Sequence, residues 1–309
     1  MAEYYFIVNI QSRTGKAERI WQEVQEELRL QKVDYEAFVT EYKGHATELA
    51  TMLIARKEPV THLVVVGGDG TSNEVLNGIS DFSRVEIGFI PTGSGNDLGR
   101  GLGLKGDAIA HLNRILHPTQ IARIDLGSVS WNQGEERRIF AISSGIGLDA
   151  DVCKQALTTK LKNVLNAIGL GSLTYVLLTI KTLFAMETTS ASIVLDTGEA
   201  FSRERMICTV AMNFRCEGGG VPMAPQASAT DGRLSFCCIS GIPKWRTFLC
   251  LPFLVLAKHE KLKGFELINC KSMDITIQKK MIVHADGEYC GDRDVLHFSC
   301  LPGVLKVRM

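Results

Sequence analysis

The first hundred residues alternate between short apolar runs and longer segments whose apolar residues recur every three or four positions. The short runs, each of which predicts a buried strand, are Tyr4–Asn9, Asp34–Thr40, Val64–Val66 and Glu86–Ile90. Between them, Ile20, Val24 and Leu28 fall on one helical face, and the segment His45–Arg56 carries a second such face. Strands that alternate with helices predict a doubly wound parallel sheet, in which ligands bind at the carboxyl ends of the strands.

After about residue 120 the pattern changes to short strands with few helices among them. The expected strands are Ile121–Val129, Arg138–Ser143, Ala191–Leu195, Arg205–Asn213, Arg233–Ile239, Ser272–Gln278, Met281–Ala285, Val295–Cys300 and Val304–Val307. Helical insertions are expected around Cys153–Met186 and Trp245–His259. We therefore predict two domains with a cleft between them, an α/β domain at residues 1–122 and an antiparallel β-sandwich with helical insertions at 123–309.

The most informative stretch is the glycine-rich segment Gly67–Glu74, which follows the valine strand and leads into a helix through Leu76. Glycines let a phosphate approach the backbone N–H groups closely, and the helix N-terminus adds partial positive charge. Asp69 would repel a phosphate unless a cation lay between them, so the segment predicts a nucleotide bound with Mg²⁺. A tight turn that merely needs glycine is the alternative. A second glycine-containing loop, Pro91–Asp97, also follows a strand, so both loops can lie at one edge of the sheet.

Composition and charge narrow the class of protein. Lys plus Arg and Asp plus Glu number 34 each, so no global basic field indicates a nucleic-acid partner. The nine cysteines lack metal-ligand spacing, and the adjacent pair Cys237-Cys238 suits neither a zinc site nor a simple disulfide framework. We expect reduced, buried thiols in a cytosolic protein. Glu3 and two tyrosines precede the first apolar run, which is not the pattern of a signal peptide.

One apolar run bears on whether the chain spans a membrane. The 18 residues between Lys162 and Lys181 carry no formal charge. A spanning helix needs about 20 predominantly apolar residues. The run contains several Asn, Ser and Thr residues and is broken by Gly169 and Gly171. We therefore expect packed helices in this segment rather than a transmembrane span.

Three motifs occur in a fixed order along the chain. They are Gly67-Gly68-Asp69-Gly70-Thr71, Pro91-Thr92-Gly93-Ser94-Gly95-Asn96-Asp97 and Asp286-Gly287-Glu288. Together they resemble the diacylglycerol kinase/sphingosine kinase superfamily, especially its soluble bacterial lipid kinases. Further matches, over nearly the full length, are Asn9, Ile124–Gly127, Gly145–Ala150, Thr230–Leu234 and Leu301–Leu305. The first motif is shared with NAD kinases and phosphofructokinases, so it is the ordered set that is specific.

The resemblance implies an α/β nucleotide domain followed by a β-sandwich lipid domain, which agrees with the periodicity. It also implies transfer of the γ-phosphoryl group of ATP to a lipid hydroxyl with the help of Mg²⁺. Asp69 would act through the catalytic Mg²⁺, supported by Asp97 and Asp125. Glu288 would accept the proton from the lipid hydroxyl, with Asp286 beside it. The residues that would bind ATP are Asn9, Thr40, Gly67, Gly68, Asp69, Gly70, Thr71, Ser72, Asn73, Glu74, Thr92, Gly93 and Ser94.

The last motif can be interpreted in two ways. His284, Asp286 and Glu288 alternate in sequence, so on a continuous strand they would share one face and both carboxylates would reach the same cleft. The alternative is a polar hairpin turn. The chain also departs from the family at its first motif, because the family usually has Asn-Pro where this chain has Asn9-Ile10.

A second departure concerns a structural metal site. Thr230 stands where the family often has an Asp, which leaves Asp231 with the carbonyls of Ser228 and Arg233 as the metal ligands that the resemblance implies. The alternative for Asp231 is a turn residue that bonds its own backbone. Asp151 lies where sphingosine kinases place an acid that pairs with the substrate amine, although an acid at a solvent-facing helix start is the favoured interpretation.

Three functions are weighed for the chain. A lipid kinase is favoured over an NAD kinase-like nucleotide kinase, because the apolar helical insertions would line a tunnel for acyl chains. A catalytically silent lipid-binding protein is the third, and the retained Asp69, Asp286 and Glu288 argue against it. Diacylglycerol, a sphingoid base and phosphatidylglycerol are all open as acceptors. We expect a cytoplasmic protein that contacts a membrane surface transiently, and a homodimer is an open alternative to a monomer.

Overall fold

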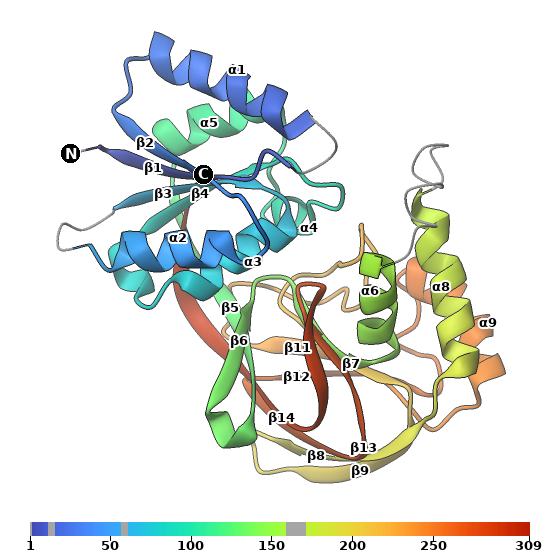
Figure 1. Ribbon diagram of the computed structural model, residues 1–309. Coiled ribbons are helices and arrows are strands. Elements are labelled where there is room, and N and C mark those ends of the chain that lie inside the picture. Colours follow the sequence, from blue (N-terminus) through green and yellow to red (C-terminus); the bar gives the residue numbers. More distant parts are fainter. Residues whose placement is uncertain (1, 12–15, 57–60, 159–170) are drawn as a thin grey trace. The chain divides into compact units, whose positions relative to one another are not determined.

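The computed structural model describes residues 2–11, 16–56, 61–158 and 171–309 (Figure 1). The chain packs as two compact units. The first is Met1–Leu126 together with Pro302–Met309, and the second is Gly127–Leu301. The boundary between residues 122 and 123 stays a prediction, while the last residues of the chain pack with the first unit.

The first unit is built on a parallel sheet, as predicted. Its strands are β1 (Tyr4–Val8), β2 (Tyr35–Val39), β3 (His62–Gly67) and β4 (Glu86–Pro91), in the order β4-β3-β1-β2. All three pairings are parallel, with Val64 opposite both Phe6 and Gly88. The end of β14 (Glu288–Arg308) adds a further parallel strand through Lys306, which lies opposite Glu86.

Helices cover both faces of this sheet. Helices α1 (Lys16–Leu30) and α5 (Ala108–Leu116) lie over one face, and α2 (His45–Ile54) and α3 (Asp69–Gly78) lie over the other (Figure 1). Helix α1 buries Trp21, Val24 and Leu28, whose spacing of three and four residues places them on one side, against Phe6 and Ile115. Two short helices, η1 (Phe82–Arg84) and α4 (Asp97–Gly101), flank β4.

The second unit is antiparallel and forms the predicted sandwich. Its strands are β5 (Ile121–Trp131), β6 (Glu136–Phe140), β7 (Ser143–Gly147), β8 (Thr189–Leu195), β9 (Ala200–Met206), β10 (Cys208–Met212), β11 (Leu234–Ile239), β12 (Phe265–Cys270), β13 (Ser272–Ala285) and the first part of β14. One layer has the order β12-β11-β10-β7-β13. Strand β13 pairs with β7 through Val283–Ala285 and with β8 through Met273–Ile277, so its two halves belong to different layers.

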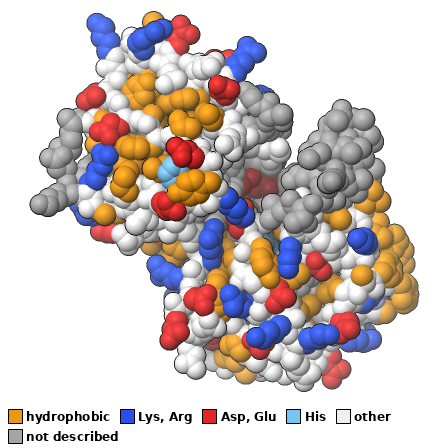
Figure 2. All heavy atoms as spheres, viewed as in Figure 1, with side chains coloured by type: hydrophobic (Ala, Val, Ile, Leu, Met, Phe, Trp, Pro, Cys, Tyr) orange, Lys and Arg blue, Asp and Glu red, His pale blue; other side chains and the backbone are white. Residues whose placement is uncertain are grey.

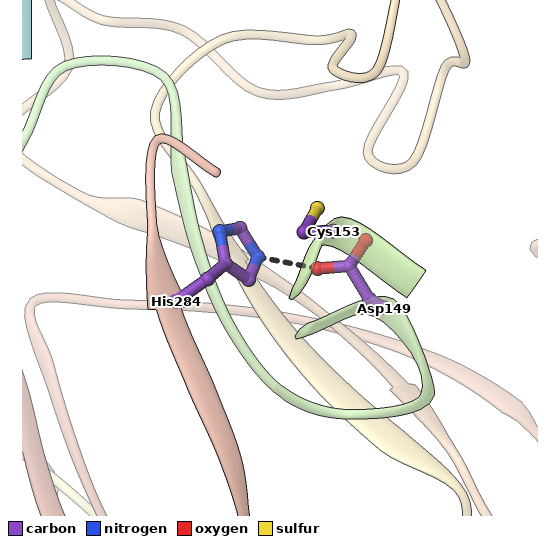
Figure 3. A group of neighbouring side chains, drawn as sticks. All are labelled: Asp149, Cys153 and His284. Atoms are coloured by element: carbon purple, nitrogen blue, oxygen red, sulfur yellow. Dashed lines mark hydrogen bonds and ion pairs between the residues drawn. The ribbon is translucent and has the colours of Figure 1, made fainter. Parts of the chain in front are cut away.

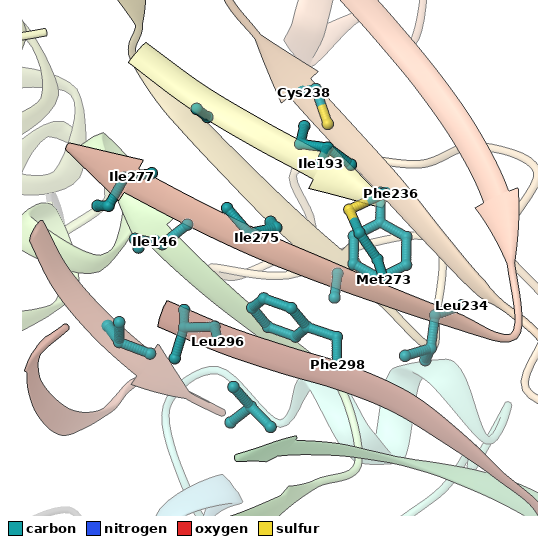
Figure 4. Packing of buried hydrophobic residues seen from close by; sticks show 14 of the residues in the cluster. Ile146, Ile193, Leu234, Phe236, Cys238, Met273, Ile275, Ile277, Leu296 and Phe298 are labelled. Atoms are coloured by element: carbon teal, nitrogen blue, oxygen red, sulfur yellow. The ribbon is translucent and has the colours of Figure 1, made fainter. Parts of the chain in front are cut away.

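Alternation along β13 shows why these strands bury one face. Met273, Ile275 and Ile277 are buried, whereas Asp274 and Thr276 between them are exposed. The buried side chains meet others from neighbouring strands (Figure 4). At the centre the rings of Phe236 and Phe298 lie 5.7 Å apart, edge to face.

Helices α6 (Leu148–Thr158), α8 (Gly171–Ala185) and α9 (Lys244–Val255) belong to the second unit, as does the short η2 (Asn132–Gly134). Residues 159–170 of the insertion predicted around Cys153–Met186 lie outside the described residues, while the insertion predicted at Trp245–His259 contains α9. Leu178 of α8 and Leu254 of α9 pack into the same cluster as Met212 of β10. Among the described residues, no helix has the length and hydropathy needed to cross a membrane.

Several elements differ from the predicted ones. Strands β7, β9 and β12 and helices α4 and α5 were not predicted. Two pairs of predicted strands are each one strand, because β13 runs through a register shift between Thr276 and Met281, and β14 continues through Pro302. The nine cysteines form no disulfide. Burial raises the pKa of the Cys238 thiol to about 12, which makes it a poor nucleophile.

Candidate active site

The glycine loop after β3 and the loop after β4 pass each other at close range. A Cβ atom on Gly93 would lie 2.7 Å from the Cα atom of Gly68, and one on Gly67 would lie 2.6 Å from the Cβ of Thr71. The N–H of Thr92 donates to the carbonyl of Gly67 at 2.9 Å. Only glycine fits this crossing, so the two loops predicted to share the carboxyl edge of the sheet do share it.

Asp69 connects the two loops. Its carboxylate accepts hydrogen bonds from the N–H groups of Asp97 and Leu98, each at 3.1 Å. These N–H groups open α4, so the charge of Asp69 stabilises the start of that helix. A Cβ on Gly95 would lie 3.1 Å from Asp69 Oδ2 and 3.4 Å from Asp97 Oδ2, which shows that both carboxylates face the same glycine.

The other polar residues of the first motif also support neighbouring segments. Asn9 donates through Nδ2 to Thr71 Oγ1 at 3.0 Å. The carboxylate of Glu74 accepts from the N–H groups of Gly44 and Ala46 at the start of α2. Glu74 therefore caps the start of α2, a role that the motif alone did not predict. Thr40, Thr71, Ser72, Asn73 and Thr92 are buried, whereas Ser94 is exposed.

Asp97 and Asp125 have different surroundings. Asp97 is buried and forms an ion pair with Arg100 one turn along α4. Asp125 is buried at the end of the first unit, where its Oδ1 accepts from the N–H of Gly303 at 2.7 Å. Asp125 therefore secures the returning C-terminal segment, and Asp97 faces Gly95 together with Asp69.

In the second unit, Asp286 and Gly287 form a two-residue turn between β13 and β14. Their φ angles are +49° and +82°, and Ala285 pairs with Glu288 across the turn. Two positive φ angles are typical of the hairpin turn that Asp-Gly favours. The expectation that His284, Asp286 and Glu288 alternate along one strand face is therefore wrong, because Asp286 lies in the turn and not in a strand.

The Asp286 carboxylate fixes the turn to the segment before β7. Oδ1 accepts from the N–H groups of Ile142 and Ser143 at 2.8 and 3.0 Å, and Oδ2 accepts from that of Ala141 at 2.8 Å. These three donors belong to buried residues, so each would cost free energy if its partner were removed. Glu288 follows at the first position of β14 and is half-buried.

A buried histidine supports the turn from the other side (Figure 3). His284 accepts the N–H of Gly287 on Nδ1 at 3.0 Å, and its Nε2 lies 2.5 Å from Asp149 Oδ2. Burial by itself lowers the pKa of His284, but the Asp149 carboxylate raises it to about 9. The bond from Gly287 opposes a second proton on Nδ1. A Cβ on Gly145 would lie 2.5 Å from Asp149 Oδ2, so glycine there makes room for the pair.

Cys153 lies one helical turn beyond Asp149, and donor atoms of Asp149, Cys153 and His284 lie within 4.8 Å of one another. A metal could bind Nε2 of His284 only if the imidazole proton moved to Nδ1. That proton would point at the N–H of Gly287, which already donates to Nδ1. The hydrogen bonds therefore favour a histidine that orients the turn over one that binds a metal.

Two further predicted positions lie in turns or helix starts. Asp231 is exposed and its Oδ1 accepts from the N–H of Arg233 at 3.0 Å, the turn geometry that was the alternative to a metal ligand. Asp151 lies in the first turn of α6, where its Oδ1 accepts from Gln155 at 3.0 Å. The metal role of Ser228, Asp231 and Arg233 stays a prediction.

The contacts of Asp149 with His284 and of Glu74 with α2 were missed by the sequence reasoning. Both depend on which loops meet in space. The motif Gly145–Ala150 contains Asp149 and was the available signal for the first of them.

Comparisons with known proteins agree over most of the chain. Residues 3–129 match the diacylglycerol kinase catalytic domain, and residues 142–309 match the YegS C-terminal NAD kinase beta sandwich-like domain. A Bacillus subtilis (strain 168) protein named "Putative lipid kinase YtlR" is 31% identical over 296 residues, which cover 94% of each chain. A diacylglycerol kinase of Staphylococcus saprophyticus is 26% identical and covers 85% of this chain and 82% of its own.

Solved structures show the same fold at lower identity. A diacylglycerol kinase from Bacillus anthracis str. Sterne is 21% identical with a TM-score of 0.74, and the match covers 99% of this chain and 96% of that one. An NAD kinase from Archaeoglobus fulgidus, solved in complex with ATP, is 12% identical with a TM-score of 0.54, over 99% and 93% of the two chains. The fold and both domain models assign the chain to the diacylglycerol kinase/YegS family, and it is a lipid kinase, a phosphotransferase, of that family.

Proposed function

We propose that this lipid kinase transfers the γ-phosphoryl group of ATP to a hydroxyl group of a diacylglycerol-like lipid. The observation that carries the nucleotide part is the crossing of two glycine loops at Gly68 and Gly93, with the N-terminus of α3 directly behind it. Backbone this close leaves no side chain to obstruct phosphate oxygens, and the helix N-terminus favours negative charge. The lipid part is supported by the family to which the chain belongs.

The donor set of the first unit fits Mg²⁺. Asp69 and Asp97 face one glycine, and carboxylate oxygens are ligands that Mg²⁺ prefers. We assign Asp69, with support from Asp97 and Asp125, to this ion. Once bound, the ion would neutralise charge on the phosphates. The N–H groups of Asp97 and Leu98 keep the Asp69 carboxylate oriented, so the residue does not reorganise when nucleotide arrives.

We assign Glu288 as the base that accepts the proton of the lipid hydroxyl. As the new bond between the lipid oxygen and the γ-phosphorus forms and the bond to the β,γ-bridging oxygen breaks, Glu288 takes the proton and ADP leaves. We keep Asp286 as the acid beside Glu288 and propose that it acts by holding the turn. Its three backbone N–H bonds support a positioning role for it.

A radiolabelled phosphoryl donor tests the proposal directly. Purified protein with Mg²⁺ and γ-labelled ATP is incubated with diacylglycerol, a sphingoid base, phosphatidylglycerol and, separately, NAD. Label transferred to a lipid and not to NAD supports the assignment, and the labelled lipid names the acceptor. Label in NAD alone would favour the NAD kinase-like alternative. GTP in place of ATP is the control for the donor.

Two further features of the proposal concern the surroundings of the protein. We propose a cytoplasmic enzyme that meets its lipid at a membrane surface without a spanning segment. The homodimer stays a prediction, and light scattering of the purified chain measures it.

A further inference from the structure

Helix α9 carries large hydrophobic side chains on opposite faces. Its inward face buries Cys250 and Leu254 in the cluster beneath β10 and β11. On its outward face Trp245 is 60% exposed and Leu249 is 56% exposed, and Leu256 at the end of the helix is 61% exposed. A helix that is apolar all round is normally buried or in lipid, so the outward face of α9 is not that of an ordinary surface helix.

The outward face of α9 continues onto α8 to form one surface. The rings of Phe184 and Phe248 lie 6.1 Å apart, and Lys244 donates to the carbonyls of Phe184 and Met186. Figure 2 shows hydrophobic side chains gathered at the edge where α8 and α9 lie. This α8–α9 surface contains half of the large exposed hydrophobic residues described in the chain: Leu177, Phe184, Trp245, Phe248, Leu249, Phe253, Val255 and Leu256.

Exposed basic residues lie in α8 and α9 and in the segment that follows α9. They are Lys181, Arg246, Lys258, Lys261 and Lys263. Within residues 171–187 and 244–263 the two acids are Glu187, which forms an ion pair with Lys279, and Glu260, whose carboxylate accepts a hydrogen bond from Gln226 at 2.6 Å. The chain as a whole has no net charge, so this local excess of positive charge is a property of the surface and not of the composition.

We propose that the α8–α9 surface docks on an anionic lipid bilayer, with the apolar side chains of α9 in the interfacial layer and the bases on the headgroups. Trp and Phe beside Lys and Arg is the composition of helices that lie in a membrane interface. A bilayer with anionic lipid attracts Lys and Arg side chains that lie near its surface. A second copy of the chain is the weaker candidate, because a two-fold interface would bring the same basic residues together.

Docking of the α8–α9 surface rests on the proposed function, because a lipid kinase must reach its substrate in a membrane. Binding to the bilayer does not itself require turnover. The chain supplies its own probe. Trp21 and Trp131 are 5% and 8% exposed, so a change in tryptophan emission on vesicle binding reports chiefly on Trp245. Vesicles of phosphatidylcholine and phosphatidylglycerol with brominated acyl chains are expected to shift the emission to the blue and quench it, and Trp245→Phe should lose that response.

A paired variant tests the apolar part of the surface. Phe248→Ser with Leu249→Ser removes two large exposed side chains and is expected to weaken partitioning into mixed vesicles at least about tenfold. The matched control is Leu30→Ser with Val295→Ser, at 69% and 54% exposure outside the surface, which should bind as the wild type does. Equal melting temperatures for all three proteins exclude a folding defect.

The basic part is tested with Arg246→Gln and Lys258→Gln. This variant should weaken binding to phosphatidylglycerol-containing vesicles and leave weak binding to pure phosphatidylcholine unchanged. Added salt should have the same effect on the wild type, because exposed charges are screened. Equal binding of the basic variant and the wild type to anionic vesicles would contradict a role for these residues.

Two outcomes overturn the docking proposal. One is no vesicle response from the wild type. The other is a dimer without lipid, with blue-shifted Trp245 emission, that becomes a monomer on Phe248→Ser with Leu249→Ser, since a second copy would then cover the surface. Turnover of detergent-dispersed diacylglycerol separates this proposal from the proposed function. Vesicle binding through α9 without kinase activity would leave docking intact and refute the activity.

Discussion

Asp69 in the first unit and Asp286 in the second are both acids whose carboxylates hold backbone N–H groups of a neighbouring segment. Asp69 accepts from two such groups at the start of α4, and Asp286 accepts from three before β7. Their settings differ. Asp69 lies where two glycine loops cross, whereas Asp286 lies in a hairpin turn with a φ of +49°. Similar contacts thus serve a loop suited to phosphate in one unit and the base of a turn in the other.

The largest expected effect comes from removing the charge at the loop crossing. Asp69→Asn keeps an oxygen that can accept one of the two N–H groups but abolishes the negative charge. We expect turnover to fall on the order of 10³-fold or more, because the variant loses charge stabilisation that acts through Mg²⁺. Single-turnover assays with Mg²⁺ and ATP measure the change.

The control for that variant is Asp34→Asn, an exposed acid of the same unit. It should have wild-type activity. If Asp69→Asn melted normally and had near-normal turnover, Asp69 would not take part in the chemistry. Its role would then be to hold backbone N–H groups, as Asp286 does.

The second prediction concerns Glu288, the residue that the hairpin presents. Glu288→Gln retains shape and hydrogen bonding but cannot accept a proton, and should lower the lipid-kinase rate by about 10²- to 10⁴-fold. The affinity for ATP should change little, because the proposed nucleotide loops belong to the first unit. Single-turnover rates against pH, with exposed Glu199→Gln as the control, measure it. A wild-type rate with an unchanged basic limb would assign the base elsewhere, with Asp69 as the next candidate.

Asp286→Asn makes the same chemical change as Asp69→Asn, but we expect it to lower the stability of the protein and not to act through the chemistry. Asn tolerates the positive φ of the turn, but its NH₂ group would face one of the three backbone N–H donors. One buried donor then lacks a partner, which costs about 1–3 kcal/mol of the free energy of unfolding. Urea denaturation measures it. If Asp286→Asn lost turnover with unchanged stability, Asp286 would be an acid of the chemistry and not a positioning residue.

The same two regions show how much of the candidate site could be predicted from the sequence. The loop at Asp69 is continuous in sequence, so the valine strand, the glycines and the helix start predicted it together. The turn at Asp286 depends on partners about 140 residues away, including Asp149 and Ala141, and no local period indicates which segments those are. Alternation in sequence suggested a strand at Asp286, but Asp-Gly turn chemistry took precedence.

The fold shows the same contrast. Helix α1 and strands β1 to β4 were predicted, because amphipathic helices and buried parallel strands have strong periods. Strand β7 was missed since Ser143–Gly147 consists largely of Ser and Gly, yet all of it is buried. The pairing of Lys306 with Glu86 joins residues far apart in the chain and is a property of the tertiary structure alone.

A smaller effect is expected at Asp231, the predicted structural metal ligand. If Mg²⁺ binds there, the ion should raise the melting temperature of the wild type, and Asp231→Ala should lower that temperature and abolish the Mg²⁺ effect. Asp69→Asn is the control, because it removes the other proposed Mg²⁺ site and should retain any stabilisation that comes from Asp231. Unchanged Mg²⁺-dependent stabilisation in Asp231→Ala would leave only the turn contact to Arg233.

The smallest effect is a pH dependence that separates the units. In the first unit, burial lowers the pKa of His62 and of His111, helped by Arg308 and Arg114 respectively. As the pH falls below about 6.5, the unfolded chain binds protons that the folded unit resists, so these residues reduce stability on acidification.

In the second unit, the pKa of His284 is shifted in the opposite direction, upward. Burial lowers the pKa of His284 and the hydrogen bond from Gly287 to Nδ1 opposes its second proton, but the Asp149 carboxylate raises the pKa to about 9. Any stability that the charged imidazole contributes is therefore present below about 6.5 and falls as the pH rises toward 9. Acidification from neutral pH should therefore raise the equilibrium constant for global opening of the first unit, with no such contribution from His284 to the second. Amide exchange measures that constant once each observed rate is divided by the intrinsic rate at the same pH. His62→Asn with His111→Asn should flatten the response of the first unit. If acidification still destabilised the first unit in that double variant, other groups would cause the acid sensitivity. The difference between the two units would then not come from these histidines.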